Sequence, residues 1–147
     1  TFPMPTLAAV NGHAFGAGFM CALCHDIRFV RSDRGFMCAN EVEIGMVIPK
    51  PELALFRHKL PMNTFFETVQ LAKRWSGNDA VAAGVAQKSE PLETLLEASI
   101  KRASELARLG ANREVYGKTK QAIYGENAAI NQPHGPAYML TNPAAFH

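Results

Sequence analysis

The stretch PTLAAVNGHAFGAG, residues 5–18, decides how this chain folds. Its first part, Leu7 to Asn11, is a short apolar run that ends in Asn-Gly, a pattern typical of a buried strand leading into a turn. Its last part, Gly16-Ala17-Gly18, opens a helical stretch that we expect to continue to about Cys24. The first amides of a helix lack internal partners and carry the positive end of its dipole. This arrangement therefore predicts a site for a negatively charged group.

Beyond this stretch the sequence predicts two more strands, then helices. From Asp26 to Ser32 the apolar residues Ile27, Phe29 and Val30 alternate with Arg28 and Arg31, which indicates a strand. A shorter strand is expected over 36–38. Apolar residues recur at helical spacing at Leu53, Phe56 and Leu60, and again at Phe65, Val69 and Ala72. Further helices are expected over Ala80 to Ala83, from Pro91 to Gly110 and from Asn112 to about Tyr124. In the helix from Pro91 to Gly110, one apolar stripe contains Leu92, Leu95, Leu96 and Ile100. This order predicts a mixed α/β (α+β) domain with helices over a small sheet.

Composition limits the function classes. The 147 residues are 48% hydrophobic and 19% charged, which suits a globular domain with one core. The net charge of +2 comes from scattered residues, so nucleic acid is a poor candidate partner. Residues 1–25 contain no charged side chain, as expected of a segment inside a core. They lack the basic start of a secretory signal and an apolar run of spanning length, and without an initiator Met we expect a longer polypeptide.

Three cysteines and no secretory signal predict a reducing, intracellular compartment without a disulfide framework. Cys21-Ala22-Leu23-Cys24-His25 has the spacing of covalent haem attachment, although such cytochromes require export. The alternative is a buried helix whose small apolar positions are Cys. A zinc site lacks a second pair of ligands at suitable spacing, so we expect no metal.

The glycine turn has two other interpretations. A dinucleotide fingerprint would need Gly or Ala where Cys21 stands, and Asp26 follows too closely to hold a ribose. The glycines could also serve backbone packing alone.

The residues themselves carry a family resemblance. Residues 5–18 and 22–28, followed by 33–36 and 40–45, resemble the signature of the enoyl-CoA hydratase/isomerase (crotonase) family. The match extends over roughly residues 3–125. It implies the crotonase/ClpP-like fold, with residues 1–127 as a partial domain that lacks the N-terminal portion of the fold. Helical periodicity is lost towards the C-terminus, so we expect 128–147 to be an irregular tail.

The resemblance also implies a site. In the family a thioester oxygen lies between two backbone amides, one of which corresponds to Ala17 N–H here. Hydratases of the family use two glutamates. In this chain the first of the two positions is occupied by Met20, and the second by Glu41 in Asn40-Glu41. A single carboxylate suits a shuttle that takes a proton from C2 and returns it to C4, as in Δ3,Δ2-enoyl-CoA isomerases of the peroxisomal type. Met20, Phe36 and Pro49 would line the acyl pocket and raise the pKa of the Glu41 carboxyl by excluding water. The full set of expected substrate-binding residues is Gly16, Gly18, Met20, Phe36, Asn40 and Pro49.

Other polar residues near the glycine turn have alternative expected roles. Glu43 is the rival to Glu41, and either could be a solvated loop carboxylate. His13 and His25 are expected to make structural hydrogen bonds, and Asp26 to be a capping or structural acid.

The resemblance implies an acyl-CoA substrate in fatty-acid β-oxidation, no cofactor besides the coenzyme A of that substrate, and a homo-oligomer, trimer or hexamer. The compartment is expected to be the peroxisome or the cytoplasm. Two alternatives stay open: a catalytically inactive acyl-CoA-binding or trimer-forming module, and another crotonase reaction, such as hydration, dienoyl-CoA isomerisation or thioester hydrolysis.

Overall fold

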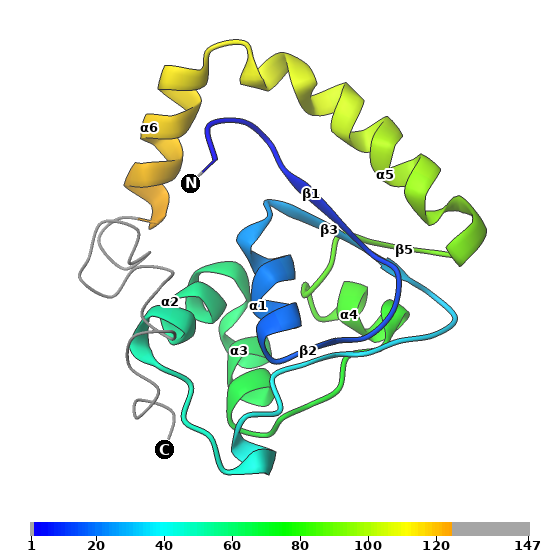
Figure 1. The fold of residues 1–147 in the computed structure, drawn as a ribbon, viewed down its shortest axis with the longest axis vertical. Helices are drawn as coiled ribbons and strands as arrows, with labels where there is room; N and C mark the ends of the chain where they lie inside the picture. The colour runs from blue at the N-terminus through cyan, green and yellow to red at the C-terminus, as the bar shows by residue number, and fades with distance from the viewer. Residues whose placement is uncertain (1, 125–147) are drawn as a thin grey trace.

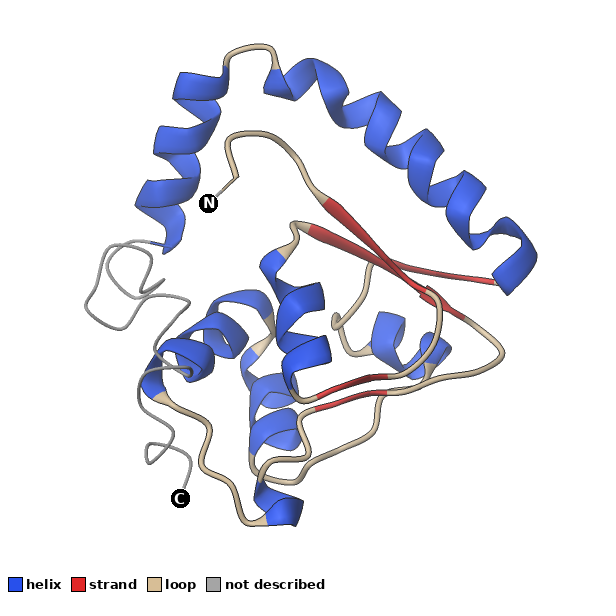
Figure 2. Ribbon diagram, in the orientation of Figure 1, coloured by secondary structure: helices blue, strands red, loops and turns tan. Residues whose placement is uncertain are grey.

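Two small parallel sheets organise the part of the chain that the computed structural model describes, residues 2–124 (Figure 1). Strands β1 (Leu7–Val10), β3 (Ile27–Arg31) and β5 (Lys88–Glu90) form one sheet in the order β1-β3-β5. Strands β2 (Ala14–Phe15) and β4 (Met37–Cys38) form the other, as the red arrows in Figure 2 show. The observed α/β class agrees with the expected one, with a second sheet in addition.

The helices follow the expected order along the chain. They are α1 (Ala17–Cys24), α2 (Lys50–Lys59), α3 (Met62–Val69), α4 (Gly77–Ala82), α5 (Leu92–Leu106) and α6 (Arg113–Tyr124), with 3-10 turns η1 (Val42–Ile44) and η2 (Ala107–Gly110). In Figure 1, α5 lies on one side of the β1-β3-β5 sheet and α1 to α4 lie on the other. No helix within residues 2–124 is long and apolar enough to span a membrane. The predicted irregular tail, 128–147, lies outside the described residues.

The sequence patterns missed β2, β5 and η1. The two residues of β2 are too few to show a period of two, and β5 consists of the polar residues Lys88, Ser89 and Glu90. These short strands exist because neighbours pair with them: Ala14 lies opposite Met37, and Ser89 lies opposite Val30.

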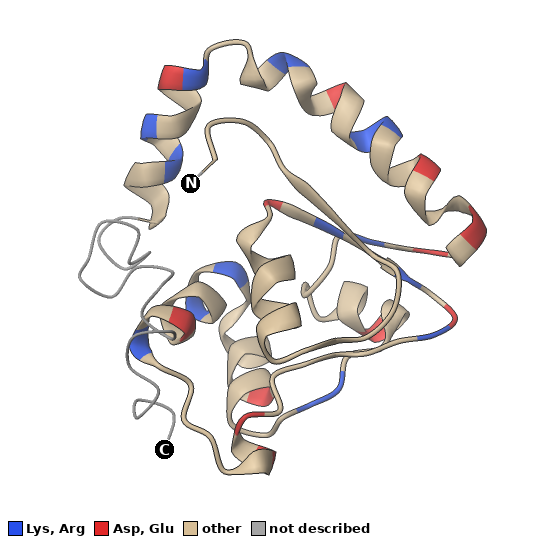
Figure 3. Cartoon of the chain, viewed as in Figure 1, with Lys and Arg blue, Asp and Glu red and all other residues tan. Residues whose placement is uncertain are grey.

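The core lies between α1 and the helices that follow it. Phe19 on α1 meets Phe56 on α2 edge to face, with ring centroids 5.3 Å apart, and both side chains are fully buried. Trp75 is buried as well, and its indole N–H donates to Thr68 Oγ1 at 2.9 Å. The uncharged residues 2–25 supply β1, β2 and α1, which Figure 3 draws without charged colours. The expectation that this stretch belongs to a core is confirmed for α1, where Phe19, Met20, Ala22 and Leu23 are buried.

The structure corrects the expectation for Arg28. The alternation in β3 placed Arg28 on a polar side, but the side chain is only 2% exposed. Its Nε donates to Val85 O at 2.7 Å and its Nη1 to His25 O at 3.0 Å. A buried guanidinium requires such acceptors, and they come from segments that the pattern of β3 cannot show.

The apolar stripe of α5 also differs from expectation. Of its large residues only Leu95 is buried, whereas Leu92, Leu96 and Ile100 are exposed. Leu95 and Ser99 are the buried residues of α5, which contacts β1, β3 and β5. One narrow face of the helix therefore meets the sheet.

Candidate active site

Helix α1 is preceded by a glycine in a backbone conformation that favours glycine. Gly16 has φ +50° and ψ −120°, a conformation that side-chain-bearing residues rarely adopt. Its N–H donates to Cys38 O at 2.9 Å, and its carbonyl accepts from Met20 N–H at 3.1 Å. Ala17 and Gly18 are exposed, and within residues 2–124 the Ala17 N–H has no hydrogen bond outside α1. An amide with this freedom at a helix N-terminus can donate to a negatively charged oxygen.

Glu41 lies against this turn. It follows β4, precedes η1 and is 7% exposed. A Cβ built on Gly16 would lie 3.1 Å from Glu41 Oε1 and 3.8 Å from Asn40 Oδ1, so both side chains reach the backbone of Gly16. The other oxygen, Glu41 Oε2, is buried and has no hydrogen-bond partner among the described residues. The structure thus brings together Gly16, Asn40 and Glu41 beside the first turn of α1.

Burial raises the pKa of the Glu41 carboxyl, and a backbone hydrogen bond opposes this only in part. A carboxyl with a raised pKa holds its proton more readily, which suits a group that accepts and returns a proton. The rival Glu43 is exposed and forms an ion pair with Arg74 at 3.4 Å. The geometry therefore favours Glu41 over Glu43.

The three residues expected to wall a pocket have different surroundings. Met20 is buried in the core cluster, and Pro49 is buried where α2 begins. Phe36 is 39% exposed, and its ring centroid lies 5.8 Å from that of His13. Their part in an acyl pocket stays a prediction.

The cysteine interpretation needs a correction. Cys21 and Cys24 are exposed, although a buried helix was expected to hold them in the core. Phe19, Met20, Ala22 and Leu23 occupy the inward face, and at helical spacing this leaves both cysteines outside. Cys38 is buried and donates its thiol to Ala72 O at 3.2 Å. Within the described residues no group of three His, Cys, Asp or Glu side chains is arranged to hold a metal ion.

Three polar residues near the turn, His13, His25 and Asp26, were expected to have structural roles. The His13 ring packs beside Phe15 and Phe36, and the buried His25 Nδ1 has no hydrogen-bond partner within residues 2–124, so the hydrogen bond expected there is not seen. The structural role of Asp26 is confirmed, because its Oδ2 accepts from Thr6 N–H at 2.7 Å and from Lys120 Nζ at 2.6 Å.

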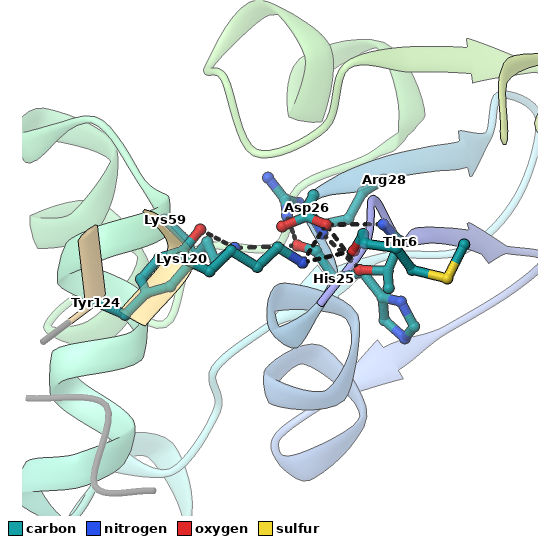
Figure 4. Close-up of polar contacts among 8 residues, drawn as sticks. Thr6, His25, Asp26, Arg28, Lys59, Lys120 and Tyr124 are labelled. Carbon is teal, nitrogen blue, oxygen red and sulfur yellow. Dashed lines mark hydrogen bonds and ion pairs between the residues drawn. The ribbon is translucent and has the colours of Figure 1, made fainter. Parts of the chain in front are cut away.

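Sequence reasoning missed the polar cluster around Asp26, drawn in Figure 4. It joins Arg28, Lys59, Lys120 and Tyr124 to the end of α1, across up to 94 residues of sequence between Asp26 and Lys120. It also missed Glu52 on α2, whose pKa burial raises and whose Oε2 is buried without a partner in the described chain. Neither follows a local pattern, so no sequence signal could have found them.

Comparisons with known proteins show the family of this chain. The profile of the enoyl-CoA hydratase/isomerase family matches residues 1–140. Enoyl-CoA delta isomerase 3 of Arabidopsis thaliana is 37% identical over 127 residues, which are 84% of this chain and 53% of that protein. The peroxisomal enoyl-CoA delta isomerase 2 of the same plant is 36% identical, over 87% of this chain and 55% of that protein. The chain spans about half the length of the curated relatives that it matches.

Solved structures show the same fold. An enoyl-CoA isomerase from Mtb has a TM-score of 0.78 at 29% identity, over 86% of this chain and 55% of that one. An enoyl-CoA hydratase from Mycobacterium ulcerans Agy99 has a TM-score of 0.77, also at 29% identity, over 86% and 54%. Structures named for different reactions are equally similar, so the fold does not select the reaction.

Proposed function

Because the chain belongs to the enoyl-CoA hydratase/isomerase family, we propose that it is part of an enoyl-CoA isomerase that moves a double bond from C3 to C2 of an acyl-CoA thioester. The observation that carries this proposal is the buried carboxyl of Glu41 against the first turn of α1. The buried Met20 stands where the resemblance places the first of the two glutamates of a hydratase. One carboxyl can shuttle a proton, whereas a methionine cannot activate water.

The proposed mechanism uses two groups of this chain. The Ala17 N–H donates to the thioester oxygen while negative charge develops on it, because an amide at a helix N-terminus stabilises such a charge. The Glu41 carboxylate removes a proton from C2, and the electron pair forms the C2–C1 double bond of an enolate. The same carboxyl then returns the proton to C4, so that the C3–C4 double bond becomes a C2–C3 double bond. The substrate is thereby neither oxidised nor hydrated.

The pathway, the compartment and the assembly are part of the proposal. We place the reaction in fatty-acid β-oxidation, in the peroxisome or the cytoplasm, with a trimer or hexamer as the assembly. The peroxisomal relative at 36% identity supports that compartment. No cofactor besides coenzyme A is needed, because the proton shuttle requires none.

The second candidate is an acyl-CoA-binding member of the family without turnover, favoured by the apolar Met20. It differs from the isomerase in one respect: it binds a 3-enoyl-CoA and releases it unchanged.

A comparison of Glu41→Gln with Glu43→Gln in the whole protein tests the proposal. Loss of a positioned acid/base should lower kcat for a 3-enoyl-CoA about 10²- to 10⁴-fold in Glu41→Gln, with binding retained. Glu43→Gln, at the exposed pair with Arg74, should keep wild-type turnover. Product analysis decides among the alternatives: a 2-enoyl product supports the isomerase, a 3-hydroxyacyl product supports a hydratase, and binding without product supports the non-catalytic module.

A further inference from the structure

The C-terminal end of α1 is held by two cations from other elements. The His25 carbonyl, directly after the helix, accepts from Arg28 Nη1 at 3.0 Å and from Lys59 Nζ at 3.3 Å (Figure 4). Carbonyls at a helix C-terminus carry partial negative charge, so two cations at this point are favourable. Arg28 belongs to β3, whereas Lys59 is the last residue of α2.

Helix α6 holds this end in turn. Lys59 Nζ donates to Tyr124 Oη at 2.5 Å and lies 4.3 Å from the centre of that ring. One α6 turn earlier, the buried Lys120 donates to Asp26 Oδ2 at 2.6 Å and to Met4 O at 2.9 Å. Since Asp26 follows His25, α6 is anchored to the end of α1 at two points.

The opposite end of α1 is held by the hydrogen bond from Gly16 N–H to Cys38 O and by the buried Phe19, with no charged side chain or side-chain cap. Its first turn has no acidic residue, and Gly16 supplies no side-chain cap. Eight residues make a rod of about 12 Å, so a tilt at the His25 end moves the amides at the Ala17 end. Transition-state stabilisation by an amide depends on its distance and direction to the oxygen.

We propose that Lys59 is a positioning residue for the reaction: by bridging the His25 carbonyl and Tyr124, it sets the direction of α1 and therefore the place of the Ala17 amide relative to Glu41. This inference rests on the proposed isomerase function. Lys59 acts through the helix and does not touch the substrate.

The charge of Lys59 should change in a pH range in which turnover can be measured. Burial lowers the pKa of its ammonium to about 8, Arg28 and Lys120 act in the same direction, and Asp26 and Cys24 oppose them. Its hydrogen-bond partners are the His25 carbonyl and the Tyr124 hydroxyl. The cation is thus present below about pH 8 and lost above it, and kcat should fall across the same range.

Four variants of the whole protein test the role of Lys59. Lys59→Met should lower kcat for a 3-enoyl-CoA about tenfold, with KM changed less than twofold. Lys59→Arg should restore most of kcat and remove the fall above pH 8, because its guanidinium stays charged. Tyr124→Phe keeps the ring but removes the hydroxyl, and should lower kcat about threefold. Lys118→Met is the matched control, since Lys118 is an exposed α6 lysine, and should leave kcat unchanged.

Hydrogen exchange of the α1 amides provides a readout independent of turnover. Lys59→Met should accelerate exchange in a peptide covering 16–24 at least threefold, while peptides of α3 exchange as in the wild type. Wild-type kcat with wild-type α1 exchange in a folded Lys59→Met overturns the positioning role. If Lys59→Met does not fold, unchanged kcat and α1 exchange in Tyr124→Phe overturn it. If the wild type has no isomerase activity, the proposed function fails, and the exchange of α1 alone decides whether Lys59 positions the helix.

Discussion

At the scale of single residues, Gly16 and Glu41 depend on each other. Gly16 has a positive φ and no side chain, and a Cβ at this position would lie only 3.1 Å from Glu41 Oε1. Burial keeps the carboxyl out of water and raises its pKa. A glycine at this position therefore serves the backbone turn and leaves room for the Glu41 carboxyl.

Gly16→Ala and Gly18→Ala should change stability in opposite directions. At φ +50° and 3.1 Å from Glu41 Oε1, a methyl group at Gly16 should lower the free energy of unfolding by about 1–3 kcal/mol. Gly18 lies in α1 with no atom within 4 Å of a built Cβ, so Ala there should raise it by up to about 1 kcal/mol. Urea unfolding of both variants measures this, and equal effects would contradict the strain at Gly16.

At the scale of elements, α5 shows the difference between a pattern and a contact. Its apolar residues recur at helical spacing, and a helix forms where that spacing predicts it. The sheet nevertheless covers only a narrow face, because α5 contacts β1, β3 and β5 with Leu95 and Ser99 as its buried residues. Leu95 is 2% exposed, whereas the adjacent Leu96 is 64% exposed.

Leu95→Ala and Leu96→Ala form a matched pair on this helix. Truncation of Leu95 leaves a cavity against the sheet and should cost about 2–5 kcal/mol. Truncation of Leu96 removes an exposed side chain and should change the free energy of unfolding by about 0.5 kcal/mol or less. Chemical denaturation of the two variants gives the comparison, and a large loss from Leu96→Ala would mean that another surface covers this face of α5.

At the scale of the whole molecule, the ion pair of Asp26 with Lys120 joins the beginning of the described chain to its end. Lys120 contacts Asp26 and Met4, and Asp26 contacts Thr6. Burial alone would raise the pKa of Asp26, but hydrogen bonds from Lys120 and Thr6 outweigh it and lower the pKa below its usual value. A lowered carboxyl pKa means that folding is favoured by the charged form.

The contribution of Asp26 to stability should be present above its unfolded pKa of about 4 and disappear as the pH falls through its lower folded value. Asp26→Asn should lower the free energy of unfolding by about 3 kcal/mol at pH 7, because Lys120 then stays buried without its counter-charge. The loss should shrink at pH 2. Asp33→Asn, at the exposed pair with Arg31, is the control and should show little effect at either pH. Urea unfolding at both pH values checks this, and a pH-independent loss in Asp26→Asn would contradict the linkage.

The local elements were largely predictable because their causes are local. The apolar run of β1, the glycine turn and the helical spacing from α1 to α6 all lie within a few residues of the structure that they produce. The resemblance of the same residues also indicated Glu41, and its burial beside Gly16 agrees with that choice. What failed was the direction of side chains: Arg28 faces inward, Cys21 and Cys24 face outward, and most of the α5 stripe is uncovered.

The sequence by itself determined the type and order of the main elements and the family, and through the family resemblance it predicted the pair of positions, Ala17 and Glu41, on which the proposed reaction depends. Only the tertiary structure decided which faces are buried and how α1 is held between Gly16 and His25. The physical reason is one of range. Hydrophobic spacing and glycine geometry act over a few residues, whereas the bonds that hold α1 join His25 to Lys59 and Asp26 to Lys120, groups that only the folded chain brings within hydrogen-bond distance.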